Sequence, residues 1–432
     1  MKRLKPFAFS LLVALAGVAG ERNLETRSAT IVLDVSPNDL INIRAKNTDL
    51  VVETWDKNQV EIVATLRYDG KMTNKMTDFM DNFQEYVEEN IAHSGGQLRI
   101  DTNLDEPNKI QIGSKHVGII IGFSEDELKL DYKIKAPKQN DFEIDNSYKD
   151  VALIGDFGKV KLTQYSGELK AGYIEDAEIN LKYGSSSFRG IGSGVAELYE
   201  QKLDAVTIEE LELNAKYSEI EVGKLKWMKT TSYETDFVLE QVGSISGNFK
   251  YGELEIKDEL ENAKFEFYET DIEVSNAGII EFRSSKYAKI KLGQVSQLTF
   301  DESYEDELTI RELGAFSSRD SKYGKHEIQT LSGSFSIKGY EDDIEVEEVL
   351  ESADIIDIEG KYINAQLGIS SQSFNFNSYV KYGKVNYDEG KVEIKKYIKD
   401  GDVLEIEAYS KSKTGDPLTI SVKGYEIDVD ID

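Results

Sequence analysis

The sequence predicts a mainly β protein, a parallel β-solenoid (β-helix) with coils of roughly 17–18 residues. A regularly recurring tyrosine and the short strands beside it carry this prediction. Between residues 141 and 388 a tyrosine returns every 16 to 22 residues. A fixed period of this kind is the signature of a repeat architecture, in which each unit buries its apolar face by stacking on its neighbours. The recurring tyrosines are Tyr148, Tyr165, Tyr183, Tyr199, Tyr217, Tyr233, Tyr251, Tyr268, Tyr287, Tyr304, Tyr323 and Tyr340, followed at looser spacing by Tyr362 and Tyr382.

Each tyrosine lies between two short alternating apolar segments. Ile220 and Val222 follow Tyr217, and Leu298 and Phe300 precede Tyr304. Alternation with a period of two is typical of β-strands, because successive side chains point to opposite faces. The segments between strands are too short for crossover helices, so we expect the strands to coil into a parallel solenoid.

Two kinds of repeat alternate. In one, a lysine precedes the tyrosine, as in Lys250-Tyr251-Gly252; in the other, a glutamate follows it, as in Tyr268-Glu269. The glutamate repeats place their apolar pair one residue further on, which predicts a bulge. A coil of about 35 residues would stack like charges on each other, which is unfavourable. We therefore expect the shorter coil, with Lys250 near Glu234 or Glu269.

The tyrosine column itself allows two interpretations. The favoured one is a stacked ladder that seals the bend of every coil and leaves the hydroxyl groups at the surface. A stacking platform for sugars or bases is the alternative.

Composition narrows the classes of partner. The chain has 432 residues, which is more than a single core usually holds. It carries 51 basic and 81 acidic residues, a net charge of −30, so nucleic acid and anionic membranes are disfavoured as partners. The sequence contains no cysteine, and therefore neither disulfides nor thiolate metal sites.

Residues 1–20 are typical of a signal peptide. Lys2, Arg3 and Lys5 precede an apolar run over residues 7–15, which small residues follow. The run is too short to span a membrane, which takes about 20 apolar residues. We expect an exported protein, periplasmic or secreted to the cell surface, with no transmembrane segment after signal removal.

The rest of the chain divides into three predicted parts. Residues 21–140 form an N-terminal β-rich capping domain, residues 141–388 the solenoid repeats, and residues 389–432 the C-terminal cap strands. The first part contains an amphipathic helix over about 71–91, expected to pack on the first strands and cover the open end of the solenoid. Its apolar stripe consists of Met72, Met76, Phe79, Met80, Phe83, Val87 and Ile91.

Three sequence features together resemble a known family. They are the turn Thr54-Trp55-Asp56-Lys57-Asn58, the segment Ala136-Pro137-Lys138 and the repeated Lys-Tyr-Gly units with Ile-x-Ile strands. The pattern resembles a bacterial family of exported β-solenoid proteins of unknown function that bears the name adhesin. The resemblance implies an exported solenoid with a binding role and supplies no catalytic motif.

Neither the histidines nor the carboxylates form a recognisable catalytic or metal motif. His93, His116 and His326 lack the spacing of a metal pair or a triad, and we expect them at the surface or at edges. Clustered carboxylates could hold Ca²⁺ or cleave polysaccharides, but a solvated, ion-paired edge is the favoured interpretation. These clusters are Glu234/Asp236, Glu269/Asp271, Glu305/Asp306/Glu307 and Glu341/Asp342/Asp343.

The predicted function is that of a non-enzymatic, adhesin-like binding protein or structural protein at the bacterial cell envelope. No catalytic residue, cofactor or metal is expected, and the ligand is an envelope or extracellular glycan or protein. A carbohydrate-active enzyme on the same scaffold is the alternative. The candidate binding edge consists of Glu234, Asp236, Glu269, Asp271, Glu305, Glu341, Tyr233, Tyr268, Tyr304 and Tyr340.

Overall fold

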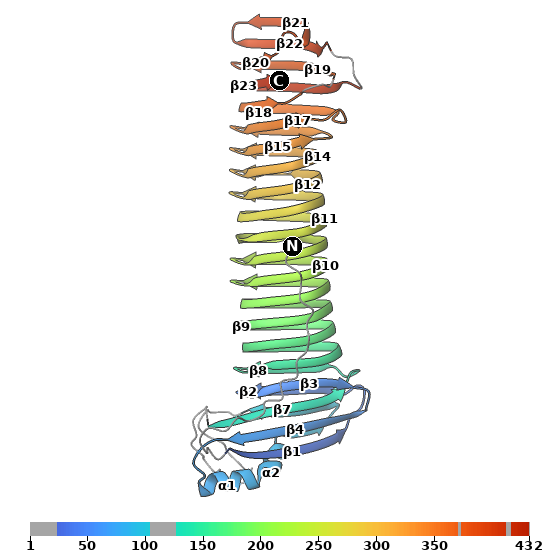
Figure 1. Ribbon diagram of the computed structural model, residues 1–432, viewed down its shortest axis with the longest axis vertical. Helices are drawn as coiled ribbons and strands as arrows, with labels where there is room; N and C mark the ends of the chain where they lie inside the picture. Colours follow the sequence, from blue (N-terminus) through green and yellow to red (C-terminus); the bar gives the residue numbers. More distant parts are fainter. Residues whose placement is uncertain (1–23, 104–126, 370–372, 412–415, 432) are drawn as a thin grey trace.

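The chain winds into a long stack of β-strands with two short helices at one end (Figure 1). This computed structural model describes residues 24–103, 127–369, 373–411 and 416–431. The predicted signal peptide lies outside the described residues. Among the described helices, none is long and apolar enough to cross a membrane.

The strands in the middle of the stack pair in parallel at a nearly constant offset along the chain. Glu219 pairs with Lys202 on one side and with Asp236 on the other, an offset of 17 residues. Ile272 pairs with Ile290, an offset of 18 residues. The mean tyrosine spacing of about 17.5 residues therefore equals the offset between neighbouring strands.

Long continuous strands make up much of this region, because the extended backbone passes through several corners without a break. The strands are β8 (Phe142–Ser147), β9 (Val151–Lys216), β10 (Glu219–Tyr233), β11 (Asp236–Lys286), β12 (Lys289–Phe300), β13 (Ser303–Tyr304), β14 (Glu307–Lys322), β15 (Lys325–Leu331), β16 (Phe335–Tyr340), β17 (Asp343–Val349) and β18 (Ile355–Leu367).

The two kinds of repeat differ in which residue takes the left-handed conformation at the corner. In a lysine repeat this residue is the tyrosine, as at Tyr251 with φ of 57°. In a glutamate repeat it is the glutamate, as at Glu234 with φ of 44°. The pairing of β10 with β11 stays in register up to Tyr233 and Lys250, so the predicted bulge is wrong. The extra residue instead moves the corner by one position.

A ladder of phenylalanine rings fills the interior over several turns. Phe282 stacks on Phe300 with ring centroids 4.6 Å apart and an interplanar angle of 7°. Phe316 stacks on Phe335 at 4.8 Å. These side chains are almost completely buried. Since strands repeat every 17 or 18 residues, apolar residues at the same position in each turn fall on top of one another.

The N-terminal end is a mixed β region. β1 (Glu25–Asp34), β4 (Gln59–Tyr68) and β7 (Leu128–Pro137) pair antiparallel in that order, and β7 pairs in parallel with β3 (Asp49–Trp55), which continues onto β9. A second row runs from β5 (Ile91–Ser94) through β6 (Gln97–Asn103) and β2 (Leu40–Lys46) to β8.

The predicted helix over 71–91 is two helices. α1 (Asn74–Asp81) begins after Thr73, whose hydroxyl accepts a hydrogen bond from the Met76 amide, and α2 (Phe83–Glu89) follows Asn82. Asn82 has ψ of 17°, outside the helical range, and it interrupts the helix. The central part of the apolar stripe is buried as expected, whereas Met72 is 36% exposed and Ile91 belongs to β5. Both helices lie beyond β1 at the end of the stack, as Figure 1 shows.

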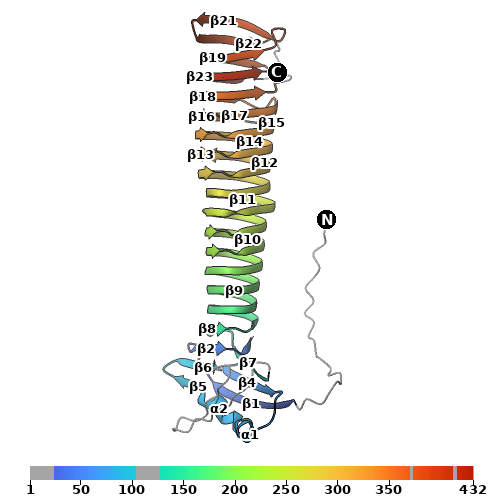
Figure 2. The same ribbon diagram turned by 90° about the vertical axis from the view of Figure 1, so that its left-hand side faces the viewer.

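At the C-terminal end, the order in space differs from the order in sequence. β23 (Leu418–Ile431) pairs in parallel with β18 on one side and with β19 (Phe374–Lys381) and β20 (Lys384–Tyr387) on the other. β22 (Val403–Ser410) pairs antiparallel with β19 and with β21 (Val392–Asp400), which lies outermost. Figure 2 shows β23 between β18 and β19.

The same insertion corrects the order of the tyrosine column. Tyr425 of β23 lies between Tyr362 and Tyr382, with ring centroids 5.7 Å and 5.3 Å away. Sequence spacing had placed Tyr382 directly after Tyr362. A strand from the chain end takes that place because β23 presents the same repeat pattern as the coils.

Candidate functional site

The tyrosine rings form an unbroken column from Tyr148 to Tyr382. Neighbouring rings have centroids 5.1–5.9 Å apart and interplanar angles of 64–81°. The expected succession of Tyr233, Tyr251 and Tyr268 on neighbouring turns is confirmed. In this edge-to-face geometry each ring covers part of its neighbour's face. The column therefore agrees with a structural ladder and offers poor access to a ligand that must stack on an open ring face.

The predicted ladder of alternating lysine and glutamate charges is wrong. Lys250 pairs across the strands with Tyr233, because the corner of the glutamate repeat is displaced by one residue. Lys250 does lie next to Glu234, whose amide donates a hydrogen bond to the Lys250 carbonyl at 2.8 Å, but its ammonium group forms no ion pair with Glu234 or Glu269. The short coil was expected because it would place lysine and glutamate side chains in ion pairs, and that reason is incorrect.

The glutamates at these corners interact with tyrosine hydroxyl groups. Hydrogen bonding to Glu269, and then its negative charge, raises the pKa of Tyr268. The same two effects of Glu341, together with burial, raise the pKa of Tyr340. A hydroxyl that donates to a carboxylate loses its proton less readily.

We expect Lys250→Gln to change the free energy of unfolding by less than about 0.5 kcal/mol, because the ammonium group makes no ion pair with any residue that the structure describes. Lys264→Gln is the matched variant, since the Lys264 ammonium lies 2.8 Å from the Glu281 carboxylate. That exposed pair is worth at most about 1 kcal/mol and weakens with salt. Urea unfolding at low and at high salt measures the change in the free energy of unfolding for both variants. A salt-dependent loss of stability in Lys250→Gln would mean that Lys250 does take part in a ladder of opposite charges.

The candidate edge residues do lie along one line of the structure, and several of them have structural partners. The Asp236 carboxylate accepts a hydrogen bond from the Glu253 amide at 3.0 Å. The Asp271 carboxylate accepts one from the Lys289 amide at 3.1 Å. Glu234, Glu269, Glu305 and Glu341 all occupy left-handed corners. These roles in the corner account for the recurrence of the residues, and the binding role of the edge stays a prediction.

Two carboxylates expected on the solvated edge are buried. Asp306 accepts hydrogen bonds from the Ala288 amide at 2.9 Å and from the Ser303 hydroxyl at 2.6 Å. Asp342 accepts one from the Gly324 amide at 2.7 Å. The left-handed glutamate turns the following side chain inward. The sequence held one signal of this, because Thr235 and Thr270 take the same position in other glutamate repeats and are also buried.

Asp342 belongs to a buried polar cluster with Ser321 and His326. The Ser321 hydroxyl lies 3.1 Å from the Asp342 carboxylate and 3.3 Å from Nε2 of His326. Burial lowers the pKa of His326 to about 4 and raises that of Asp342 to about 6. The set contains the residue types of a catalytic triad, but the Asp342 carboxylate is hydrogen-bonded to the serine, and Nδ1 of His326 has no hydrogen-bond partner among the described residues. Sealed from solvent, these residues cannot reach a substrate.

The expectation that the histidines lie at the surface or at edges is wrong for His326. It pairs with Leu308 and Ile344 of the neighbouring turns, at a position that is apolar in both. Nε2 of His93 lies 2.9 Å from the Asp39 carboxylate, and His116 lies outside the described residues. Over the described parts of the chain, no cluster of three or more histidines, aspartates or glutamates could hold a metal ion.

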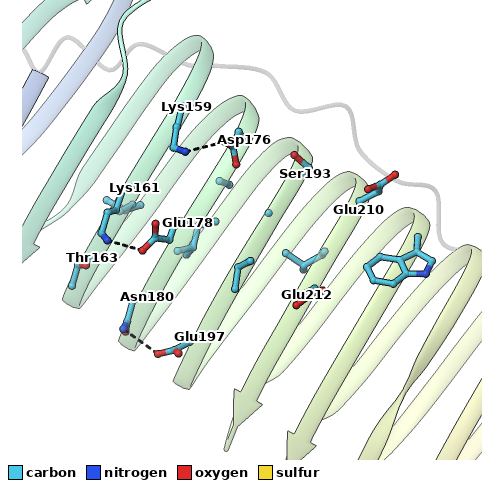
Figure 3. A pocket seen from close by; sticks show the side chains of 17 residues that line it. Lys159, Lys161, Thr163, Asp176, Glu178, Asn180, Ser193, Glu197, Glu210 and Glu212 are labelled. Atoms are coloured by element: carbon cyan, nitrogen blue, oxygen red, sulfur yellow. Dashed lines mark hydrogen bonds and ion pairs between the residues drawn. The ribbon is translucent and has the colours of Figure 1, made fainter. Parts of the chain in front are cut away.

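A surface groove with a volume of about 840 Å³ lies across successive turns of β9 and β10 (Figure 3). Ion pairs and hydrogen bonds between neighbouring turns close its first half. Lys159 pairs with Asp176 at 3.3 Å and Lys161 with Glu178 at 2.7 Å. The Asn180 amide donates to Glu197 at 3.3 Å.

Two carboxylates in the second half of the groove have no partner among the described residues. Glu210 and Glu212 form no ion pair or side-chain hydrogen bond with any described residue, and Figure 3 shows them beyond the paired lysines. Val195 is 52% exposed. Trp227 is partly exposed and is the cross-strand partner of Glu210 on the next turn. The groove thus combines an accessible indole ring with unpaired carboxylates.

Sequence reasoning missed this groove. Trp227 stands at an outward position of a strand, directly before the buried Met228. The available signal was a large aromatic residue among charged outward-facing neighbours. Its contact with Glu210 depends on the offset of 17 residues between the strands, which the sequence gives only as an average.

Comparisons with known proteins leave the family open. No family model and no curated protein matches the sequence. A solved structure from Clostridium sporogenes named "putative cell adhesion protein" is similar at 8% identity and a TM-score of 0.16, covering 94% of this chain and 100% of that chain. Another, named "Putative lipid binding protein" from Parabacteroides distasonis, has 12% identity and a TM-score of 0.16, covering 78% and 96%. At such TM-scores neither similarity supports an inference about this chain.

Proposed function

We propose that the protein is an exported, non-enzymatic β-solenoid of 17–18-residue coils that binds a glycan at the bacterial cell envelope. The observation that carries the proposal is the open half of the groove, where Trp227 lies beside the unpaired carboxylates of Glu210 and Glu212. The signal-like residues 1–20 support export.

The chemistry of the groove suits a neutral polyhydroxylated ligand. An indole ring presents a large apolar surface, on which the C–H face of a sugar can pack. Ionised carboxylates accept hydrogen bonds, and sugar hydroxyls donate them. Glu210 and Trp227 lie on successive turns, at the strand spacing of about 4.8 Å, which suits a chain-like ligand lying along the stack. The same carboxylates repel polyanions, in agreement with the net charge of −30.

The described residues also support a non-enzymatic role. A catalytic acid and base need surroundings that separate their pKa values. The buried cluster of Ser321, His326 and Asp342, in which burial shifts the pKa values of the histidine and the aspartate, is closed to solvent. The exposed carboxylates of the corners recur from turn to turn in similar surroundings.

A glycan array probed with residues 21–432 tests the proposal. We expect retention on one class of neutral glycan, and an affinity at least about tenfold weaker for Trp227→Ala, because buried tryptophans at binding interfaces typically contribute 2 kcal/mol or more. Trp55→Phe is the matched control, since Trp55 is the last residue of β3 and does not line the groove.

Two outcomes would overturn the proposal. One is the absence of any bound glycan, or equal binding by Trp227→Ala. The other is turnover of a polysaccharide by the purified protein that a single carboxylate substitution abolishes, which would establish the enzymatic alternative.

A further inference from the structure

The last strand of the chain fills a slot between strands that precede it in sequence. β23 pairs in parallel with β18, where Ile427 lies opposite Ile363. On its other side, Ile420 lies opposite Phe376 of β19 and Val429 opposite Val385 of β20. Without β23, two strand edges inside the stack would lose their hydrogen-bond partners. An open edge of this kind is a template for another strand.

The slot buries one complete face of β23. The inward side chains are at most 5% exposed, and they alternate along the strand. They are Leu418, Ile420, Val422, Ile427, Val429 and Ile431. Apolar burial of this extent makes the strand a large contributor to the C-terminal end of the stack.

Three features make the slot specific for this sequence. Gly424 faces Gly360, and a Cβ atom at residue 424 would lie 1.9 Å from the Gly360 carbonyl oxygen. Tyr425 completes the tyrosine column on both sides. The Asp428 carboxylate accepts a hydrogen bond from the Lys384 amide at 2.9 Å. Only a strand with glycine, tyrosine and aspartate at these positions reproduces every contact.

From this arrangement we infer that the slot is a strand-acceptor site and that its partner is the C-terminal strand of a second copy of this chain. β23 is synthesised after β18, β19 and β20, which form the slot, so the slot stays open until β23 has been made. A second copy offers an identical strand, and exchange between copies keeps all the contacts of the slot, which makes it a low-cost route to a dimer. Exchange would join two rods at their C-terminal ends. This inference is independent of the glycan groove.

Cysteine pairs introduced into the full chain can detect the exchange, because the sequence contains no cysteine. Gln366 and Asp430 are cross-strand partners between β18 and β23. Two differently tagged proteins, one with Gln366→Cys and the other with Asp430→Cys, are unfolded together, refolded at high concentration and oxidised. We expect a disulfide-linked dimer that carries both tags and that increases with protein concentration. The double variant in one chain, refolded at low concentration, shows that the position permits a disulfide.

The control is a cross-strand pair in the middle of the stack, Glu221→Cys and Val238→Cys, on strands that follow each other directly in sequence, so that no later segment is inserted between earlier ones. An equal yield of mixed dimer from the two pairs would overturn the inference. A free peptide of residues 417–431 should compete and lower the yield of the Gln366/Asp430 dimer. The same peptide with Gly424→Val should not compete, because its side chain would collide with the Gly360 carbonyl. Equal competition by both peptides would contradict the specificity of the slot.

Discussion

Replacing Phe282 with alanine should lower the free energy of unfolding by about 3–5 kcal/mol, the usual range for a buried phenylalanine. Its ring is 1% exposed and contacts three others, those of Phe265, Phe267 and Phe300, with centroids 4.6–5.6 Å away. The neighbouring turns are fixed by their own hydrogen bonds, so the cavity should collapse only in part. Urea unfolding followed by circular dichroism measures the loss.

Tyr287→Ala is the matched control from the outer aromatic column. Tyr287 contacts two rings, but its side chain is 42% exposed. We expect a loss of about 1–2 kcal/mol, since each aromatic pair contributes about 0.5–1.5 kcal/mol and less area is buried. Equal losses for the two variants would mean that the outer column, and not the interior, stabilises the stack.

Replacing His326 with leucine should remove a large part of the acid sensitivity of the protein. Burial lowers the pKa of His326 to about 4, below the ordinary 6.5 of an unfolded chain. The unfolded state therefore binds the proton first, and the wild-type protein loses stability as the pH falls from about 6.5 to 4. Between pH 8 and pH 5 this loss is about 2 kcal/mol. Leucine fits the position, because the neighbouring turns carry Leu308 and Ile344 there.

Asp342 has the opposite effect on the pH dependence of stability, so its contribution must be distinguished from that of His326. Burial raises its pKa to about 6, above the ordinary 3.8, so the folded state gains stability as the pH falls through 6 towards 3.8. Burial also raises the pKa of Asp306, so this carboxylate likewise adds stability as the pH falls. Both carboxylates are present in wild type and in His326→Leu, and the difference between the two pH profiles therefore isolates the histidine. Parallel profiles between pH 8 and pH 5 would contradict the account, and Asp342→Asn tests the opposing contribution.

The repeating part of the fold could be predicted because the spacing of tyrosines and apolar residues in the sequence indicates it directly. The tyrosine column and the alternating apolar pairs give the offset between parallel strands, which the pairing of Glu219 with Asp236 reproduces. The apolar stripe around Phe79 and Phe83 likewise gave the buried face of the helical segment. The break at Asn82 has a weaker signal, since an asparagine within a helical pattern is often tolerated.

Features that depend on register or on distant segments could not be predicted. A shift of one residue at the left-handed corner pairs Lys250 with Tyr233 across the strands and turns Asp306 and Asp342 inward. The charge of an aspartate predicts a solvent-exposed side chain. In the structure, the backbone conformation at the corner determines whether the side chain points to the solvent or to the interior. The insertion of β23 between β18 and β19 joins segments that are far apart in the chain, and spacing alone places Tyr382 before Tyr425.

The most direct test of glycan binding at the groove is a fluorescence titration of the Trp55→Phe protein. Trp227 is then the only tryptophan, because the sequence contains two. Addition of the glycan identified on the array should change the Trp227 emission in a saturable way, and Glu210→Gln with Glu212→Gln should weaken the binding. If the glycan binds with the same affinity in a separate assay while the Trp227 emission stays constant, its site lies elsewhere and the proposed groove is wrong.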